Sequence, residues 1–406
     1  MVHSRVERAS GGTNIPKSHA RRHRSSLSKA LTVIAILLVG GAIGAIATHV
    51  VQQHNRTSPS TTTTTQVSGT GGNASSALKV TAEAPTNGST GISGNAAIVL
   101  TFSDPLSTSS PLPTLTPAVA GTWSRGEKTL TFTPSTGFIP QSTVTVTVPA
   151  GATGVSSVAG AELAEPTTEH FRVANGSVLR LQQVLSLLDY SPLAWTATGS
   201  AIAATDSSSQ IAALYTPPTG TFAWKNSGWP ARLLRMWHPG VDNVFTRGLI
   251  MSFQADHELD PDGAITPALW LALVDALSTG TLNTGGYNYA LADKTPPESL
   301  TIYHDGSVVL RSPANTGVAA SPTPDGTFPV NTRLRRQVMK GTNPNGQHYA
   351  DLVQYIAYFH GNDAVHYMNR DDYGIPQSLG CVELPLSDAA KAWPYLAYGT
   401  LVTVIN

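Results

Sequence analysis

An uncharged apolar stretch at residues 30–51, ALTVIAILLVGGAIGAIATHVV, divides the chain into two unequal parts. As a helix it is long enough to cross the hydrocarbon layer of a bilayer. The preceding residues 1–29 carry seven Lys and Arg side chains and only one acid, Glu7. By the positive-inside rule, residues 1–29 form a basic cytoplasmic segment and residues 30–51 a transmembrane anchor. We therefore expect a single-pass cell-membrane protein whose other domains are extracellular or periplasmic.

A second interpretation of the same stretch is a cleaved signal peptide, because AIA at residues 45–47 resembles a signal-peptidase site. The protein would then be secreted. Both interpretations place the remaining chain outside the cytoplasm. The anchor is favoured because the basic region is long and the apolar run has the full length of a spanning helix.

The composition of the chain limits its partners. Charged residues make up 12% of the sequence and the formal net charge is zero. A nucleic-acid-binding protein would need a basic face, so nucleic acid is not expected as a partner. Residues 52–77 are a low-complexity Ser/Thr/Gly segment that cannot bury a core. They predict a flexible linker that holds the later domains away from the membrane.

Residues 78–173 have the pattern of an antiparallel β-sandwich. The segments AAIVLTF, TLTFTP and STVTVTVPAGA alternate β-branched and other residues between Pro and Gly turn signals. Together with GISGNAAIVLTFSDPL and TLTFTPSTGFIPQSTVTVTV, this region resembles the bacterial Ig-like domains of cell-surface proteins. No catalytic grouping is visible in it, so a spacer or adhesive role is expected.

Residues 177–280 are predicted to be helical. In SVLRLQQVLSLLDY, the residues Leu179, Val184, Leu187 and Leu188 lie near one helical face, and the later segment GLIMSFQADHELDPDGAITPALWLAL repeats such spacing. The two segments resemble the small helical peptidoglycan-binding domain, which implies binding to the bacterial cell wall. An insertion at residues 191–243 interrupts the resemblance. A helical domain that serves packing alone is the other interpretation.

Residues 285–406 return to strand patterns and predict a mainly β catalytic domain. The segment LTIYHDGSVVLRSP alternates and carries Asp305-Gly306, which is a hairpin turn signal. Strand patterns recur in TPDGTFPV, ADLVQYIAYF, AVHY and GTLVTVIN.

This last region holds Cys381, the single cysteine of the chain. An exported protein with one cysteine cannot use it for an internal disulfide, and a thiolate is a strong nucleophile when an imidazole takes its proton. His360 and His366 precede it by 21 and 15 residues. His366 lies in a predicted strand, so a returning loop could bring Cys381 opposite it. Amide groups near Gly380 and Cys381 could stabilise an oxyanion.

At these residues the chain resembles the L,D-transpeptidase catalytic domain. The family has a His in a strand, then Ser-x-Gly-Cys and an apolar residue, and AVHY…YGIPQSLGCVELP supplies the matching residues here. The segments TPDGTFPV and YGTLVTVIN resemble two further family elements. The resemblance implies Cys381 as nucleophile, His366 as general base and acid, and Gly380 in the oxyanion site. Ser378, Tyr349 and Arg370 are the candidate substrate-binding residues.

The resemblance also implies a reaction. Cys381 would attack a peptidoglycan tetrapeptide stem at its third residue, release the terminal D-Ala and form a thioester. The amine of a second stem would resolve the thioester and form a 3→3 cross-link in the cell wall. Such enzymes typically react with carbapenems at the cysteine. No cofactor and no metal are implied.

The sequence departs from the family pattern at three positions. Leu379 replaces a frequent His, Glu383 replaces a frequent Arg or Asn, and Tyr367 follows the base in place of Gly or Ser, which leaves the group that orients the base unassigned. Three alternatives remain open: an L,D-carboxypeptidase that uses water as acceptor, a non-catalytic peptidoglycan-binding or adhesion protein, and a zinc peptidase that uses His360, Asp363 and His366.

Overall fold

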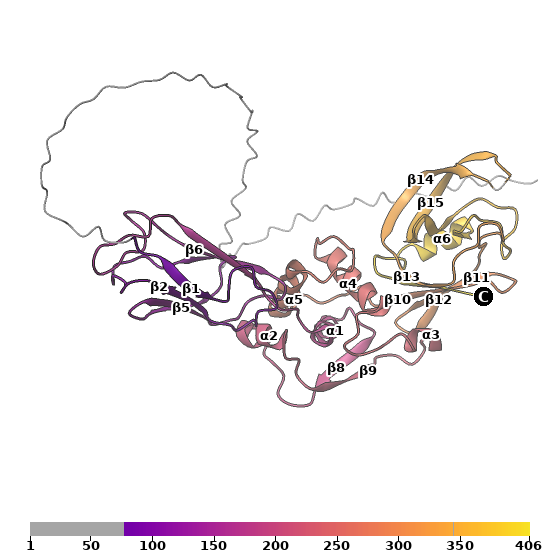
Figure 1. Ribbon diagram of the computed structural model, residues 1–406. Helices are drawn as coiled ribbons and strands as arrows, with labels where there is room; N and C mark the ends of the chain where they lie inside the picture. Colours follow the sequence, from indigo (N-terminus) through magenta and orange to yellow (C-terminus); the bar gives the residue numbers. More distant parts are fainter. Residues whose placement is uncertain (1–76, 344) are drawn as a thin grey trace, which may run out of the picture. The chain divides into compact units, whose positions relative to one another are not determined.

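The computed structural model describes residues 77–343 and 345–406 (Figure 1). The predicted basic segment, the predicted anchor and the linker up to residue 76 lie outside the described residues. Among the described residues, none of the helices combines the length and the apolar character needed to cross a bilayer.

The first region consists of two antiparallel sheets, as the alternating pattern predicted. The described strands are β1 (Val80–Ala84), β2 (Ile98–Phe102), β3 (Thr114–Thr116), β4 (Gly121–Arg125), β5 (Thr129–Pro134), β6 (Thr143–Val148) and β7 (Thr167–Arg172). Their order is β1-β2-β5-β4 in one sheet and β3-β6-β7 in the other. Leu100 and Phe132 of the first sheet join Val146 and Phe171 of the second in one buried cluster. The inward residues of both sheets thus form the core of a sandwich.

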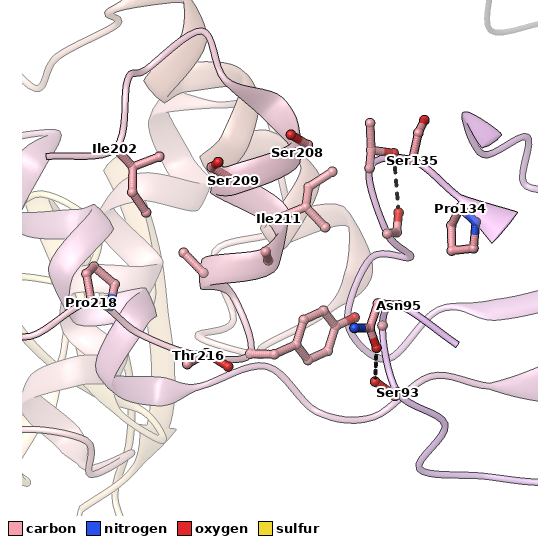
Figure 2. A pocket seen from close by; sticks show the side chains of 16 residues that line it. Ser93, Asn95, Pro134, Ser135, Ile202, Ser208, Ser209, Ile211, Thr216 and Pro218 are labelled. Carbon is pink, nitrogen blue, oxygen red and sulfur yellow. Dashed lines mark hydrogen bonds between the residues drawn. The ribbon is translucent and has the colours of Figure 1, made fainter. Parts of the chain in front are cut away.

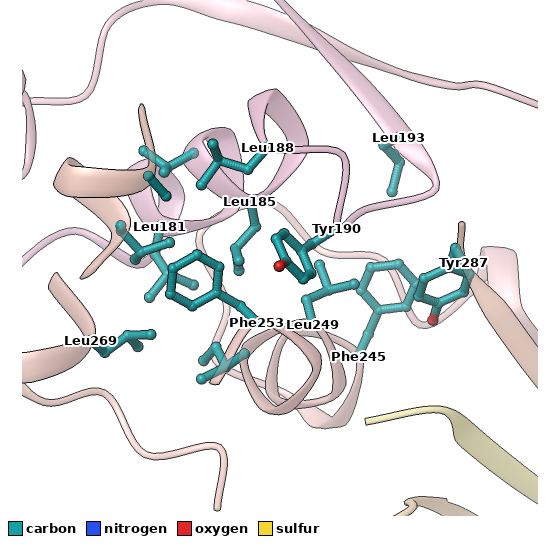
Figure 3. Packing of buried hydrophobic residues seen from close by; sticks show 14 of the residues in the cluster. Leu181, Leu185, Leu188, Tyr190, Leu193, Phe245, Leu249, Phe253, Leu269 and Tyr287 are labelled. Atoms are coloured by element: carbon teal, nitrogen blue, oxygen red, sulfur yellow. The ribbon is translucent and has the colours of Figure 1, made fainter. Parts of the chain in front are cut away.

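The second region is built on the helices α1 (Val178–Leu187), α4 (Val244–Asp256) and α5 (Pro267–Thr279). Side chains from all three helices form a buried cluster with Tyr190 and Tyr287 (Figure 3). The buried face of α1 carries Leu181, Val184, Leu185 and Leu188, at helical spacings of three and four. The prediction of Leu187 on this face was therefore wrong, since its side chain is 40% exposed.

The insertion at residues 191–243 has its own secondary structure. It contains the hairpin of β8 (Leu193–Ala197) and β9 (Gly220–Trp224), with the short helices α2 (Ser207–Ala213) and α3 (Ala231–Leu234). Trp224 and Trp237 from this segment both pack edge-on against the buried ring of Phe245. The insertion therefore extends the helical core instead of looping away from it.

The third region has two sheets. The strands are β10 (Asn288–Asp293), β11 (Ser299–His304), β12 (Ser307–Pro313), β13 (Gly326–Pro329), β14 (Thr332–Thr342), β15 (His348–His360), β16 (Asp363–Tyr367), β17 (Val382–Leu384) and β18 (Leu401–Ile405). They are ordered β12-β11-β10-β18-β13 and β14-β15-β16-β17. The helix α6 (Leu386–Ala392) contributes Ala389 and Ala392 to the cluster that both sheets share. This confirms the predicted mainly β region.

The predicted hairpin at Asp305-Gly306 is confirmed. These two residues join β11 to β12 and have φ values of 46° and 78°. A two-residue hairpin turn of this kind needs positive φ at both central positions, which Asp tolerates and Gly adopts freely. The local sequence was sufficient to place this turn.

Candidate active site

The parallel pair of β16 and β17 brings His366 and Cys381 to one face of their sheet. In its register, Val365 is opposite Val382 and His366 is opposite Glu383. Side chains alternate between the two faces of a strand, so Cys381, two residues before Glu383, extends from the same face as Glu383 and His366. Val365 and Val382 extend from the other face and are fully buried in the core. The apolar partners thus fix the register that places the polar ones together.

A cavity of about 400 Å³ opens on this polar face. His366 and Cys381 both line it, as do the predicted substrate-binding residues Tyr349 and Arg370. Its remaining walls come from the β14–β15 hairpin, the turn after β15, the strands β16 and β17 and the loop between them: Gln337, Met339, Lys340, Asn343, Asp351, Val353, Tyr358, Asn362, Asp363, Met368, Gln377, Leu379 and Glu383. The other two predicted residues, Ser378 and Gly380, do not line the cavity.

His366 is held in one orientation by the backbone. Its ring nitrogen Nδ1 lies 3.0 Å from the carbonyl oxygen of Tyr367. A carbonyl can only accept a hydrogen bond, so Nδ1 carries the proton and Nε2 is left as the basic nitrogen. Burial lowers the pKa of His366, and this outweighs the opposite effects of the Tyr367 carbonyl and of Glu383. The imidazole is therefore neutral at pH 7 and able to accept a proton.

The thiol of Cys381 is protonated in the resting site. It donates to the carbonyl oxygen of Asn362 over 3.8 Å. Burial is the largest cause that raises its pKa to about 12; Asp363 and Glu383 act in the same direction, and a backbone hydrogen bond from Ala364 acts in the opposite direction. The two central groups thus form a neutral thiol and a neutral imidazole. In such a pair the proton must leave the thiol as the sulfur attacks.

Two hydroxyl groups fix the backbone at the cysteine. Ser378 Oγ donates to the carbonyl oxygen of Cys381 at 2.6 Å, and Thr323 Oγ1 donates to the same oxygen at 3.4 Å. Thr323 belongs to the TPDGTFPV segment, and its hydroxyl also accepts from the amide of Gly317 at 2.8 Å. Sequence reasoning missed Thr323 as a site residue, although the segment that contains it was recognised.

Ser378 is 1% exposed, and both hydrogen bonds of its hydroxyl group are made within its own loop. The structure therefore places it as a support of the loop rather than in contact with a substrate. The second of these bonds is received from the amide of Gly380 at 3.2 Å. The amide that was predicted to bind an oxyanion is thus occupied by Ser378 in this state.

Gly380 allows the carboxylate of Asp363 to approach the backbone beside the cysteine. A Cβ at this position would lie 2.2 Å from Asp363 Oδ1, and the φ of Gly380 is 120°. The other oxygen of Asp363 lies 3.1 Å from Nδ1 of His360. His360 is thus paired with Asp363 and is absent from the cavity wall, whereas His366 lines it. Of the two histidines, the geometry favours His366 as the base.

The zinc-peptidase alternative required His360, Asp363 and His366 to converge. Among the described residues, no group of three or more His, Cys, Asp and Glu side chains is arranged to hold a metal ion. Nδ1 of His366 is bound to a backbone carbonyl, and Nδ1 of His360 is bound to Asp363. The arrangement therefore gives this alternative no support.

Arg370 and Glu383 form a two-bond ion pair beside the base. Arg370 Nε lies 2.8 Å from Glu383 Oε2, and Nη2 lies 2.7 Å from Oε1. The Glu383 side chain is 5% exposed and that of Arg370 is 28% exposed. Two of the guanidinium donors of Arg370 are thus already used. The sequence left the role of Glu383 open, because its partner comes from the preceding loop.

A larger cavity, of about 640 Å³, lies elsewhere, between the loops of Ser93 and Ser135 and the segment around α2 (Figure 2). Its lining residues carry hydroxyl, amide and apolar groups only, with no charged side chain, histidine or cysteine. No proton acceptor for nucleophilic chemistry lines it. The smaller cavity at Cys381 is therefore the candidate active site.

Two regions of the chain match models of known protein families. Residues 287–404 match the family model of the L,D-transpeptidase catalytic domain. Residues 74–173 match that of a bacterial Ig-like domain. The resemblances to the L,D-transpeptidase and Ig-like domains are thus confirmed. The resemblance of residues 177–280 to a peptidoglycan-binding domain stays a prediction. No curated protein matches this chain.

The solved structures that are similar to this chain include L,D-transpeptidases. One from Mycobacterium smegmatis is 13% identical, and the match covers 81% of this chain and 99% of that chain, with a TM-score of 0.28. L,D-transpeptidase 3 from Mycobacterium tuberculosis is 14% identical, over 80% and 98% of the chains, with a TM-score of 0.27. The catalytic domain of the Enterococcus faecium enzyme is 27% identical, over 29% and 96%, with a TM-score of 0.27. Because these TM-scores are low, the assignment rests on the two family models.

Proposed function

We propose that this protein is a cysteine-dependent L,D-transpeptidase that acts on peptidoglycan stem peptides. The observation that carries the proposal is the position of Cys381 and His366 on one face of the β16–β17 pair, where both line the same cavity. The match of residues 287–404 to the L,D-transpeptidase catalytic domain supports this reaction class. A thiol beside a neutral imidazole is suited to acyl transfer.

In the first step, Cys381 Sγ attacks the carbonyl carbon of the third stem residue while its proton passes to Nε2 of His366. The tetrahedral intermediate collapses as the C–N bond to the terminal D-Ala breaks. His366 returns the proton to the leaving nitrogen, so D-Ala leaves with a neutral amino group. A thioester remains on Cys381. The hydrogen bond from Nδ1 to the Tyr367 carbonyl leaves Nε2 as the ring nitrogen that can accept this proton.

In the second step, a side-chain amine of another stem attacks the thioester carbonyl. His366 accepts a proton from this amine, the C–S bond breaks, and the thiol of Cys381 is reprotonated. The product is a 3→3 cross-link, with one D-Ala released in each cycle. Water as the attacking group would give a trimmed stem instead, by the same proton transfers.

The other regions fit an enzyme of the cell wall. The helical region at residues 177–280 would bind peptidoglycan and hold the catalytic domain on its substrate. The Ig-like region would act as a spacer. Residues 30–51 would anchor the chain in the membrane, with the catalytic region outside.

The direct test is turnover of a defined substrate. Full-length protein would be incubated with disaccharide tetrapeptide stems, and products would be identified by mass spectrometry, with Cys381→Ala as control. Dimers that have lost one alanine would support transpeptidation. Tripeptide stems alone would indicate the carboxypeptidase alternative. Unchanged stems with wild-type protein that still binds peptidoglycan would favour the non-catalytic alternative.

A further inference from the structure

The residue opposite the base His366 on the neighbouring strand is Glu383, which forms an ion pair with Arg370. His366 and Glu383 are register partners across the parallel β16–β17 pair, and both line the cavity. Paired residues on neighbouring strands extend from the same face, so the carboxylate lies next to the imidazole. A nearly buried carboxylate without a partner would draw a proton onto that imidazole. Arg370 meets this carboxylate with two parallel hydrogen bonds.

We propose that the Arg370–Glu383 ion pair is a positioning device for His366, in which the guanidinium neutralises the carboxylate so that the imidazole stays uncharged and able to accept the thiol proton. The inference deepens the proposed function and rests on it. Arg370 and Glu383 act through His366 and need not touch the substrate.

The geometry of the pair suits this role better than substrate binding. Arg370 uses Nε and Nη2 on Glu383, which is the side-on arrangement in which arginine and carboxylate fit best. The carboxylate is 5% exposed, so its attraction for a neighbouring proton is weakly screened by water. The opposing effects of the two groups agree with this picture, since Glu383 raises and Arg370 lowers the pKa of His366.

Other charged groups around His366 do not substitute for Arg370. On β16 itself, Asp363 is paired with His360. From β15, Asp351 lines the cavity and contributes to raising the pKa of Arg370. From β14, Lys340 also lines the cavity and forms no ion pair among the described residues. On α6, which packs against β16, Asp388 and Lys391 are paired with each other. Cys381 is a neutral thiol at rest. The guanidinium of Arg370 is therefore the cation that balances Glu383.

The test is the pKa of His366 itself, which is measurable without any turnover. Full-length protein would be labelled with [13Cε1]histidine and titrated by NMR, and the His366 signal would be assigned by its absence from His366→Gln. The compared variants are Arg370→Met, Glu383→Gln, the double variant and Arg370→Lys. We expect the pKa of His366 to rise by roughly one unit in Arg370→Met and to fall in Glu383→Gln. It should return to the wild-type value in the double variant and stay there in Arg370→Lys.

Arg370→Met leaves a buried carboxylate without a partner and can fail to fold. In that case Glu383→Gln and the double variant decide the question, because neither leaves a buried carboxylate. A lower pKa in Glu383→Gln that the double variant reverses supports the inference. An unchanged pKa in both would overturn it.

The same samples would be treated with a β-lactam and checked for acylation. If the pKa values shift as expected but wild-type protein is not acylated, the proposed function fails and the inference about His366 stands.

Discussion

The hydroxyl of Ser378 donates a 2.6 Å hydrogen bond to the backbone carbonyl of Cys381 and accepts one from the amide of Gly380. This hydroxyl therefore fixes the loop that presents the nucleophile. Ser378→Ala leaves buried partners unsatisfied, and we expect it to lower the free energy of unfolding by about 1–3 kcal/mol. It should also slow acylation of Cys381 without changing KM much. Denaturant unfolding and single-turnover acylation measure the two effects.

The matched control for this variant is Ser387→Ala. Ser387 is exposed, and its hydroxyl bonds only to the neighbouring Asp388. Its replacement should change neither quantity. An equal loss of stability and acylation rate in both serine variants would show that Ser378 does not fix the loop that presents the nucleophile.

Gly380 is needed for the approach of Asp363. Alanine there would place Cβ 2.2 Å from the carboxylate and would hold a φ of 120°, which is costly for any residue with a side chain. We expect Gly380→Ala to lose about 1–3 kcal/mol of stability and most of the acylation rate. Gly361→Ala is the control, since Gly361 has a positive φ of 52° but no atom within reach of an added Cβ. Similar rates in the two variants would show that the contact with Asp363 is unimportant.

Thr323 connects two segments that are 58 residues apart, through its bond to the carbonyl of Cys381. Thr323→Val keeps the shape of the side chain and removes the hydroxyl, so the Gly317 amide loses its acceptor. We expect a loss of about 1–3 kcal/mol and slower acylation, because the cysteine carbonyl becomes less constrained. Thr327→Val, whose hydroxyl pairs with Thr403 instead, should leave the acylation rate intact. Full acylation activity in Thr323→Val would count against this support.

The pH dependence of Cys381 follows from its protonation at rest. Because burial raises its pKa to about 12, the thiol stays protonated through neutral pH. Its reaction with iodoacetamide at pH 8 should be more than about tenfold slower than that of a free cysteine, and should still be rising at pH 10. Enzymatic acylation should instead fall only at a pH below the ordinary imidazole pKa of 6.5, because burial lowers the pKa of His366. Alkylation that levels off near pH 7 would indicate a resting thiolate–imidazolium pair.

Much of the fold could be predicted from local sequence. The alternation in AAIVLTF and STVTVTV identified strands, and Asp305-Gly306 identified its turn, because both signals depend on neighbouring residues alone. The face of α1 was harder. This helix is rich in leucine on several sides, and packing against α4 and α5 selects Leu181 and Leu185 over Leu187. That choice is made by tertiary contacts, which periodicity within one helix does not contain.

The site was predictable only where it follows a local motif. Cys381 and His366 stand in recognisable segments, and the strand alternation allowed them to meet. The orienting carbonyl of Tyr367, the pairing of Glu383 with Arg370 and the bond from Thr323 all depend on side-chain directions that are set only in the folded domain. The loop before β17 buries Ser378, which the motif alone had suggested for substrate binding.

We propose above that Cys381 is an acyl-accepting nucleophile in a site for peptidoglycan stems. The decisive measurement is the intact mass of full-length protein after incubation with a carbapenem, with Cys381→Ser treated in parallel. We expect wild type to gain the mass of one carbapenem, as the thiol opens the lactam ring, and the variant to gain none. Wild-type protein that stays unmodified, while its thiol remains free to react after denaturation, would show that Cys381 is not this nucleophile.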